Sequence, residues 1–144
     1  MNIIILNGPN LNLLGVREPE VYGYDSLDDI ESWLNKQPEV EGSKIAWFQT
    51  NHEGELIDKI HSAMGNVDGI IINPGAFTHY SYALRDAIAS VNIPTVEVHL
   101  SDIYAREEFR KVSVIKDVCI GHFTGLGKEG YAEAFKTLER ESGK

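Results

Sequence analysis

The sequence has 144 residues and a formal net charge of −9 at pH 7. This length predicts one domain, residues 1–144, that can bury about two-thirds of its unfolded surface. The negative charge argues against a nucleic-acid partner, because binding phosphate groups needs clustered lysine and arginine. No stretch has the length and apolarity of a membrane span, and no signal peptide is recognisable, so we expect no membrane partner. The single cysteine, Cys119, can form no internal disulfide and fits a reducing cytoplasm.

The chain is organised around residues 3–23. Residues 3–6 form a short apolar run that predicts a buried strand. The run stops at Asn-Gly-Pro-Asn, residues 7–10, which is a turn cluster. Only a short helix fits before the polar loop 15–23, which a glycine bounds at each end. A loop this long after a first strand is usually functional, and its two glycines predict that it moves as a lid.

Strands and helices alternate along the rest of the chain. We expect strands over 44–49, 68–72, 94–98 and 118–120, and helices over 27–36, 53–64, 80–90 and 131–139, with a further helical stretch holding Arg106 and Arg110. Ser26 is placed as an N-cap, and Thr50 with Glu53 has the spacing of a capping box. Short apolar strands alternating with helices predict an α/β fold with both faces of the sheet covered. The leading topology is a flavodoxin-like three-layer sandwich with a five-stranded parallel sheet of order 2-1-3-4-5.

This topology also predicts where a ligand binds. In such sheets the site lies beyond the carboxyl ends of the strands, where the strand order reverses between strands 1 and 3. The loops that meet there are 7–23, 73–79 and 99–102. They carry the polar residues Asn7, Asn10, Arg17, Tyr22, Asn73, His79, His99 and Ser101. Because so many proton donors and acceptors converge on one edge of the sheet, we expect the chemistry at that edge.

Glu97 and His99 are two residues apart on an extended segment, so their side chains face the same way. A carboxylate beside an imidazole fixes its tautomer and favours its protonated form, which suits a general acid; a structural pair at a strand end is the alternative. Ser101 stands where a helix is expected to begin. The free amides of such a helix start bind anions, although an ordinary N-cap would also explain the serine. His79, a lone loop histidine, is supported only by its place among the other polar residues.

Two arginines and one glycine motif leave alternatives open. Arg106 and Arg110 are four residues apart and would share a helix face, but Arg106 could simply pair with Asp102. Residues 125–130 match the dinucleotide pattern G-x-G-x-x-G. Only 14 residues follow this motif, too few for the rest of a dinucleotide-binding unit, so we interpret it as a tight turn before the last helix. His122 has no partner at metal-ligand spacing, and we predict no metal.

Other proteins of this fold class fit the sequence less well. A phosphoacceptor receiver needs acidic residues after its first strand and an aspartate ending its third, where this chain has 7–9 (Asn-Gly-Pro) and 73–74 (Asn-Pro). A flavodoxin needs a phosphate loop rich in serine, threonine and glycine after its first strand, where this chain has prolines and leucines. The residues by themselves therefore favour a lyase or isomerase first and a small-ligand binding module second.

These residues resemble type II dehydroquinases, the 3-dehydroquinate dehydratases of the shikimate pathway. The matching stretches are NGPNLNLLGVREPEVYG (7–23), FQTNHEGELID (48–58), INPGAFTHYSYALRDAI (72–88), EVHLSDIYAREEFR (97–110) and TGLGKEGY (124–131). They run in order over almost the whole chain, and the first is highly specific.

The resemblance implies a cytoplasmic homododecamer, built as a tetramer of trimers from flavodoxin-like subunits. It implies that 3-dehydroquinate loses water by anti elimination, through an enolate intermediate, to give 3-dehydroshikimate. No metal, Schiff base or cofactor takes part in the family's reaction. The reaction belongs to aromatic amino-acid biosynthesis or to quinate catabolism, and the sequence does not distinguish the two.

The resemblance also assigns catalytic roles. Tyr22 matches the lid tyrosine that removes the C2 proton, and Arg17 matches the arginine that holds this tyrosine as phenolate. Asn10 matches the asparagine that stabilises the enolate through a bound water. His99 matches the acid that protonates the departing C1 hydroxyl, and Glu97 matches the carboxylate that orients it.

The substrate-binding positions implied in the same way are Asn73, His79, Asp86, Leu100, Ser101, Arg106 and Arg110. Leu100 and Ser101 match the pair whose backbone amides take the substrate carboxylate. Asp86 matches an acid supplied across the trimer interface, and Arg106 matches a second arginine that faces the lid. The other three match residues that hold the ring hydroxyls and nearby groups.

Two positions depart from the family pattern. The family usually has asparagine where this chain has Asp102, and often histidine where it has Tyr104. Neither residue transfers a proton, so we expect activity to be kept. Asp102 adds a negative charge near the anion site, which predicts weaker substrate binding.

Overall fold

A five-stranded parallel sheet forms the middle of the molecule. The computed structural model describes residues 1–143. The strands are β1 (Asn2–Asn7), β2 (Lys44–Gln49), β3 (Gly69–Asn73), β4 (Thr95–His99) and β5 (Gly121–Thr124). They are ordered β2-β1-β3-β4-β5, and every neighbouring pair is parallel, which confirms the predicted topology. The strand order therefore reverses between β1 and β3, as the predicted site requires.

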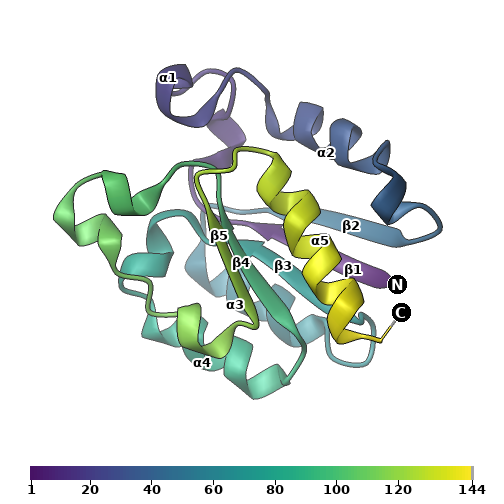
Figure 1. The fold of residues 1–144 in the computed structure, drawn as a ribbon. Coiled ribbons are helices and arrows are strands. Elements are labelled where there is room, and N and C mark those ends of the chain that lie inside the picture. The colour runs from purple at the N-terminus through teal and green to yellow at the C-terminus, as the bar shows by residue number, and fades with distance from the viewer. Residues whose placement is uncertain (144) are drawn as a thin grey trace.

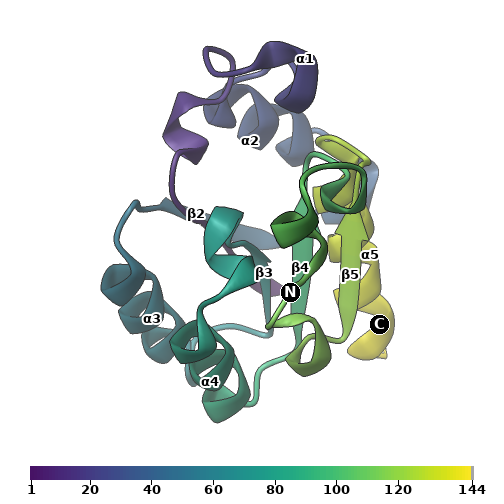
Figure 2. The same ribbon diagram turned by 90° about the vertical axis from the view of Figure 1, so that its left-hand side faces the viewer.

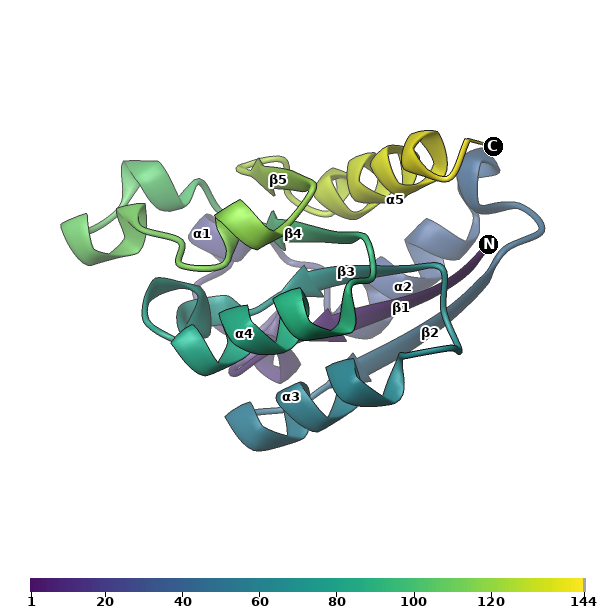
Figure 3. The same ribbon diagram turned by 90° about the horizontal axis from the view of Figure 1, so that it is seen from below.

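Helices cover both faces of this sheet (Figures 1 and 2). They are α1 (Pro19–Tyr22), α2 (Leu27–Asn35), α3 (Glu53–Ser62), α4 (Tyr82–Val91) and α5 (Glu129–Glu141). Figure 3 shows α3 and α4 on one side of the sheet and α2 and α5 on the other. Two apolar cores correspond to these two layers, since side chains of α2 and α5 pack in one and those of α3 and α4 in the other. Within the described residues, no helix is both long enough and apolar enough to cross a bilayer.

The local signals for the first half of the chain hold with one exception. Ser26 caps α2 in a full capping box with Asp29, because each side chain hydrogen-bonds the other's backbone N–H. The capping box expected from Thr50 and Glu53 is wrong. The N-cap of α3 is His52, while the Thr50 hydroxyl accepts from the His52 N–H at 3.1 Å and donates to Glu55 at 2.9 Å.

The segment between β4 and β5 also differs from expectation. It contains no α-helix but separate 3-10 turns at Ile103–Ala105, Glu108–Lys111 and Lys116–Val118. Arg106 lies between the first two turns with extended backbone (φ −108°, ψ −157°), so Arg106 and Arg110 do not share a helix face. Asp102 caps the first turn by accepting from the Tyr104 N–H, so Ser101 is not an N-cap.

The fifth strand was predicted three residues too early, at 118–120. Val118 and Cys119 are apolar because they pack into the core under α4, not because they belong to the sheet. The true strand, Gly121–Thr124, is an edge strand of only four half-buried residues with little apolar content. The hydrophobic pattern therefore marks the turn that precedes the strand rather than the strand itself. The fourth helix begins later than expected, at Tyr82, after a 3-10 turn over Gly75–His79.

Candidate active site

A pocket of about 160 Å³ opens at the carboxyl ends of β1, β3 and β4. The lid segment containing α1 and the turns that follow β4 project from this same end of the sheet (Figure 1). Ten of the predicted site residues line the pocket: Asn10, Arg17, Tyr22, Asn73, His79, His99, Leu100, Ser101, Arg106 and Arg110. The strand-order argument therefore located this pocket correctly.

The turn after β1 is built by close backbone packing. Gly8 is required, because a Cβ at this position would lie 2.6 Å from the carbonyl oxygen of Pro74. Asn10 takes the left-handed conformation (φ 69°), and its N–H donates to Asn51 Oδ1 at 3.0 Å. Gln49 Nε2 donates to the same Asn51 oxygen at 3.1 Å, which ties the turn to the end of β2. Asn10 is thus held at the pocket rim by neighbours that sequence reasoning missed.

The lid carries a tyrosine between two guanidinium groups. Gly15 and Gly23 bound the lid, and both have φ of 88°, a conformation that glycine adopts without steric cost. Arg106 Nη1 donates to the Tyr22 hydroxyl at 2.8 Å. The guanidinium carbon of Arg17 lies 4.8 Å from the centre of the same ring. The hydroxyl contact thus comes from Arg106, while Arg17 sits over the ring. Two positively charged groups thus lie close to the Tyr22 side chain.

Tyr24, the next tyrosine along the chain, lies just beyond Gly23. Its side chain is 82% exposed, and it does not line the pocket. Tyr22 is the tyrosine that the lid presents to the site.

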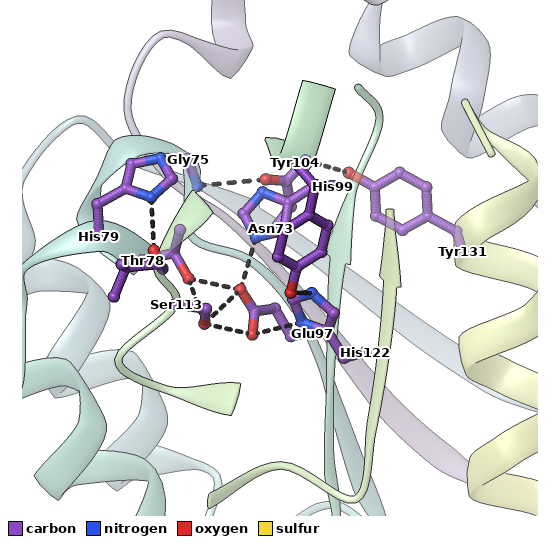
Figure 4. A network of polar contacts seen from close by, with 11 residues as sticks. Asn73, Gly75, Thr78, His79, Glu97, His99, Tyr104, Ser113, His122 and Tyr131 are labelled. Carbon is purple, nitrogen blue, oxygen red and sulfur yellow. Dashed lines mark hydrogen bonds and ion pairs between the residues drawn. The ribbon is translucent and has the colours of Figure 1, made fainter. Parts of the chain in front are cut away.

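The predicted pair of Glu97 and His99 forms at the end of β4. His99 Nε2 lies 2.6 Å from Glu97 Oε2, and both side chains are buried. Figure 4 shows the Glu97 carboxylate at the centre of a larger network. The hydroxyls of Thr78 and Ser113 hydrogen-bond to this carboxylate, as does His122 Nδ1 at 2.8 Å.

These donors determine the protonation of the pair. Burial by itself raises the pKa of Glu97, but hydrogen bonds from His122, His99 and Thr78 outweigh burial and hold that pKa well below its usual range. An ionised carboxylate only accepts hydrogen bonds, so His99 carries a hydrogen on Nε2. Its other ring nitrogen, Nδ1, is then the atom that can give a proton to a ligand, since His99 lines the pocket.

The end of β3 supplies two neutral hydrogen-bonding groups. Asn73 Oδ1 accepts from the Gly75 N–H at 3.2 Å, and its Nδ2 lies 3.4 Å from the Tyr131 hydroxyl. Tyr131 is fully buried and donates to Asn7 Oδ1 at 2.6 Å, which fixes this corner from behind. His79 Nδ1 lies 2.8 Å from the Val112 carbonyl oxygen, so this nitrogen carries the hydrogen and Nε2 is left unprotonated. Burial lowers the pKa of His79 despite the opposing hydrogen bond to Val112, which favours its neutral form.

Two arginines, Arg106 and Arg110, line the pocket together with Leu100 and Ser101. Arg106 Nη1 approaches Ser101 Oγ at 3.5 Å, and Arg110 is paired with Glu107. The glycine motif at 125–130 supports this side of the pocket, because the Gly125 N–H donates to the Ser101 carbonyl oxygen at 3.0 Å. The motif is therefore a turn before α5, as predicted, and it supports the pocket from outside.

Two predicted site residues do not line the pocket. Glu97 lies behind His99 and acts on the pocket only through that ring. Asp86 lies on the exposed surface of α4. Sequence reasoning missed Thr78, Ser113 and His122 as partners of Glu97. All three are polar side chains that hydrogen-bond to one buried carboxylate, and only the folded structure shows that they lie near it. Within residues 1–143, no three His, Cys, Asp or Glu side chains are arranged to hold a metal ion.

Fold and pocket together define a flavodoxin-like α/β protein with a polar pocket at the carboxyl ends of its strands. The family model for dehydroquinase class II matches residues 1–139. A 3-dehydroquinate dehydratase of Bacillus licheniformis is 59% identical over 130 residues, which is 90% of each chain. One of Bacillus subtilis is 54% identical over 142 residues, or 99% of this chain and 96% of the relative. The crystal structure of a type II dehydroquinase from Butyrivibrio crossotus has a TM-score of 0.93 at 48% identity and covers 96% of this chain and 97% of that one. The chain belongs to the class II dehydroquinase family, and it is a hydro-lyase.

Proposed function

We propose that residues 1–144 form one catalytic domain that converts 3-dehydroquinate to 3-dehydroshikimate and water. The observation that carries this proposal is the pairing of two proton-transfer groups across one pocket. Tyr22 comes from the lid with Arg106 on its hydroxyl, and His99 comes from the sheet with Glu97 behind it. Elimination of water next to a ketone needs such a base and such an acid together.

Tyr22 is the base. Its phenolate oxygen takes the proton from C2 of the substrate, next to the ketone, and the electron pair of the C–H bond becomes an enolate. Arg106 at the hydroxyl and Arg17 over the ring supply the positive charge that the phenolate needs. Closure of the lid strengthens both interactions by excluding water. Asn10, at the pocket rim, stabilises the enolate oxygen through a bound water.

His99 is the acid. As the enolate collapses, the C1 hydroxyl leaves with its bonding electrons and takes the proton from His99 Nδ1, so that it departs as water. Glu97 holds the ring by its Nε2–H and compensates the positive charge of the imidazolium. The base comes from the lid and the acid from the sheet, which supports departure of the C2 proton and the C1 hydroxyl from opposite faces of the substrate ring. This arrangement supports an anti elimination.

The remaining pocket residues hold the substrate. The backbone amides of Leu100 and Ser101 take its carboxylate beside Arg106, and Asn73, His79 and Arg110 hold its ring hydroxyls and nearby groups. This division is supported by where these residues lie, since the first set lies at the end of β4 and Asn73 and His79 belong to the β3 side. No lysine lines the pocket in the part of the chain that the structure describes, which supports a route without a Schiff base.

The active form is a dodecamer made of four trimers, with Asp86 reaching the pocket of a neighbouring subunit. The position of Asp86 supports this role. It is exposed on α4, close to the aromatic residue Tyr82, which is itself 68% exposed. Light scattering is expected to give a dodecamer, and Asp86→Asn is expected to lower activity without changing the assembly. A monomer that is fully active on dilution would overturn this part of the proposal.

The reaction is tested by incubating the purified chain with 3-dehydroquinate and following the absorbance of the conjugated product. The expected result is steady turnover that borohydride treatment does not inhibit. Deuterium placed at C2 on the face opposite the C1 hydroxyl should be lost to solvent, and deuterium on the same face should stay in the product. Retention of the opposite-face label would overturn the anti geometry, and absence of turnover would overturn the function itself.

A further inference from the structure

The carboxylate of Glu97 is shared between two histidines (Figure 4). His99 Nε2 lies 2.6 Å from Oε2, and His122 Nδ1 lies 2.8 Å from Oε1. His122 comes from β5, where it is the direct register partner of Glu97 on β4. The centres of the two imidazole rings are 6.0 Å apart. One negative charge therefore faces two groups that can each become positive.

The outer nitrogen of His122 leads toward the surface. His122 Nε2 lies 3.1 Å from the Tyr104 hydroxyl, and the Tyr104 side chain is 40% exposed. The contacts thus run from the pocket through His99, Glu97 and His122 to Tyr104. The proposed reaction uses only the first two of these residues.

The hydrogen bonds to Glu97 determine which nitrogen of each imidazole ring carries a hydrogen. An ionised Glu97 accepts from both of them, so His99 carries its hydrogen on Nε2 and His122 carries its own on Nδ1. His122 Nε2 is then an acceptor for the Tyr104 hydroxyl. Both rings are neutral in this arrangement. The single carboxylate between the rings can compensate the positive charge of only one further proton.

We propose that His122 is a positioning residue that tunes how tightly His99 holds its proton, acting through the shared carboxylate of Glu97. The N–H of His122 withdraws charge from Glu97, which leaves less negative charge to stabilise the imidazolium of His99. His99 therefore releases its proton more readily than it would with Glu97 to itself. The inference rests on the proposed role of His99 as the acid.

Three other titratable side chains, Arg110, Lys116 and Cys119, lie around this network. Burial lowers the pKa of His79, and the positive charge of Arg110, which lines the same pocket, adds to this lowering. Lys116 lies 5.9 Å from the centre of the Tyr104 ring. Cys119 stays a neutral thiol, because burial, followed by the charge of Glu97, raises its pKa to about 12. His122 differs from all of these in hydrogen-bonding Glu97 directly.

Three substitutions separate this role from simple packing. His122→Val removes the donor to Glu97. His122→Asn keeps an amide where Nδ1 stands but cannot titrate. Tyr104→Phe removes only the hydroxyl that binds Nε2. His61→Gln, at an exposed position on α3, is the matched control for loss of a histidine.

The first measurement follows the ring nitrogens of both histidines by NMR across pH, without substrate. In the parent protein we expect the Nε2–H form of His99, the Nδ1–H form of His122, and titrations that influence each other. In His122→Val the His99 titration should become a single step with its midpoint about 0.5–1 pH unit higher. His122→Asn should return the midpoint close to the parent value, and His61→Gln should not move it.

The second measurement is the pH profile of kcat with 3-dehydroquinate. The alkaline limb should move upward in His122→Val with little change in KM, and His122→Asn should reverse the shift. An unmoved His99 titration in His122→Val would overturn the proposal, and so would a His99 midpoint in His122→Asn that stays at the His122→Val value. Loss of the parent's His122 tautomer in Tyr104→Phe without any effect on His99 would overturn it as well. If the parent protein does not turn over 3-dehydroquinate, the proposed function fails, while the NMR titrations still decide whether His122 tunes His99.

Discussion

Replacing Tyr22 by phenylalanine tests the proposed base with the smallest change that the chain allows. The substitution removes one hydroxyl, which receives the 2.8 Å hydrogen bond from Arg106, and keeps the ring under Arg17. General acid–base catalysis contributes about 10²–10⁴-fold to a rate, which corresponds to about 2.7–5.4 kcal/mol of activation free energy. We expect kcat to fall by that factor.

The effect should fall on kcat and leave KM nearly unchanged. The pocket keeps its aromatic wall, and the substrate contacts proposed for Asn73, Ser101 and Arg110 do not involve the Tyr22 hydroxyl. Initial rates of product absorbance over a range of 3-dehydroquinate concentrations give kcat and KM separately. A thermal melt of the variant should match that of the parent, because Tyr22 is only half-buried.

Tyr24→Phe is the matched control. Its hydroxyl is on a side chain that is 82% exposed and outside the pocket, so its rate should stay within about twofold of the parent. If Tyr22→Phe turns over at the parent rate, or if Tyr24→Phe is the inactive variant, the assignment of the base is wrong.

Three further predictions concern stability and binding. Glu97 has a pKa below its unfolded value, so its ionisation stabilises the fold above about pH 4.5, and this contribution is lost as pH falls further. Urea unfolding between pH 2.5 and 4.5 should show a parent-minus-Glu97→Gln difference that shrinks by at most about 1.4 kcal/mol per pH unit on acidification; a difference independent of pH would contradict the linkage. Gly8→Ala should lower the free energy of unfolding by about 1–3 kcal/mol, because its Cβ would lie 2.6 Å from the Pro74 oxygen, and an unchanged urea midpoint would show that the turn adapts freely. Asp102→Asn should lower KM by a factor of about two to five, since an exposed charge near the anion site is worth about 0.5–1 kcal/mol. A KM that is equal or higher would refute that repulsion.

The sequence alone determined the elements whose signals are local. The capping box at Ser26, the apolar runs of β1 and β3, and the turn after β1 are encoded by neighbouring residues, and alternation of strand and helix was enough for the sheet order. The pairing of Glu97 with His99 was also predictable, because residues two apart on a strand face the same side. The edge where the site forms followed from topology, since parallel strands place all their carboxyl ends together.

Tertiary structure decided the features that depend on distant contacts. β5 has too few apolar residues to be recognised as a strand, and it exists because β4 supplies its hydrogen-bond partners. Arg106 reaches the Tyr22 hydroxyl across 84 residues of sequence, because the chain after β4 turns back in 3-10 segments instead of a helix. His122 meets Glu97 only through strand register, so no spacing along the chain could reveal it. Short-range signals set most of the elements and the pairing of Glu97 with His99, whereas contacts between distant segments set the charges around the two proposed proton-transfer groups.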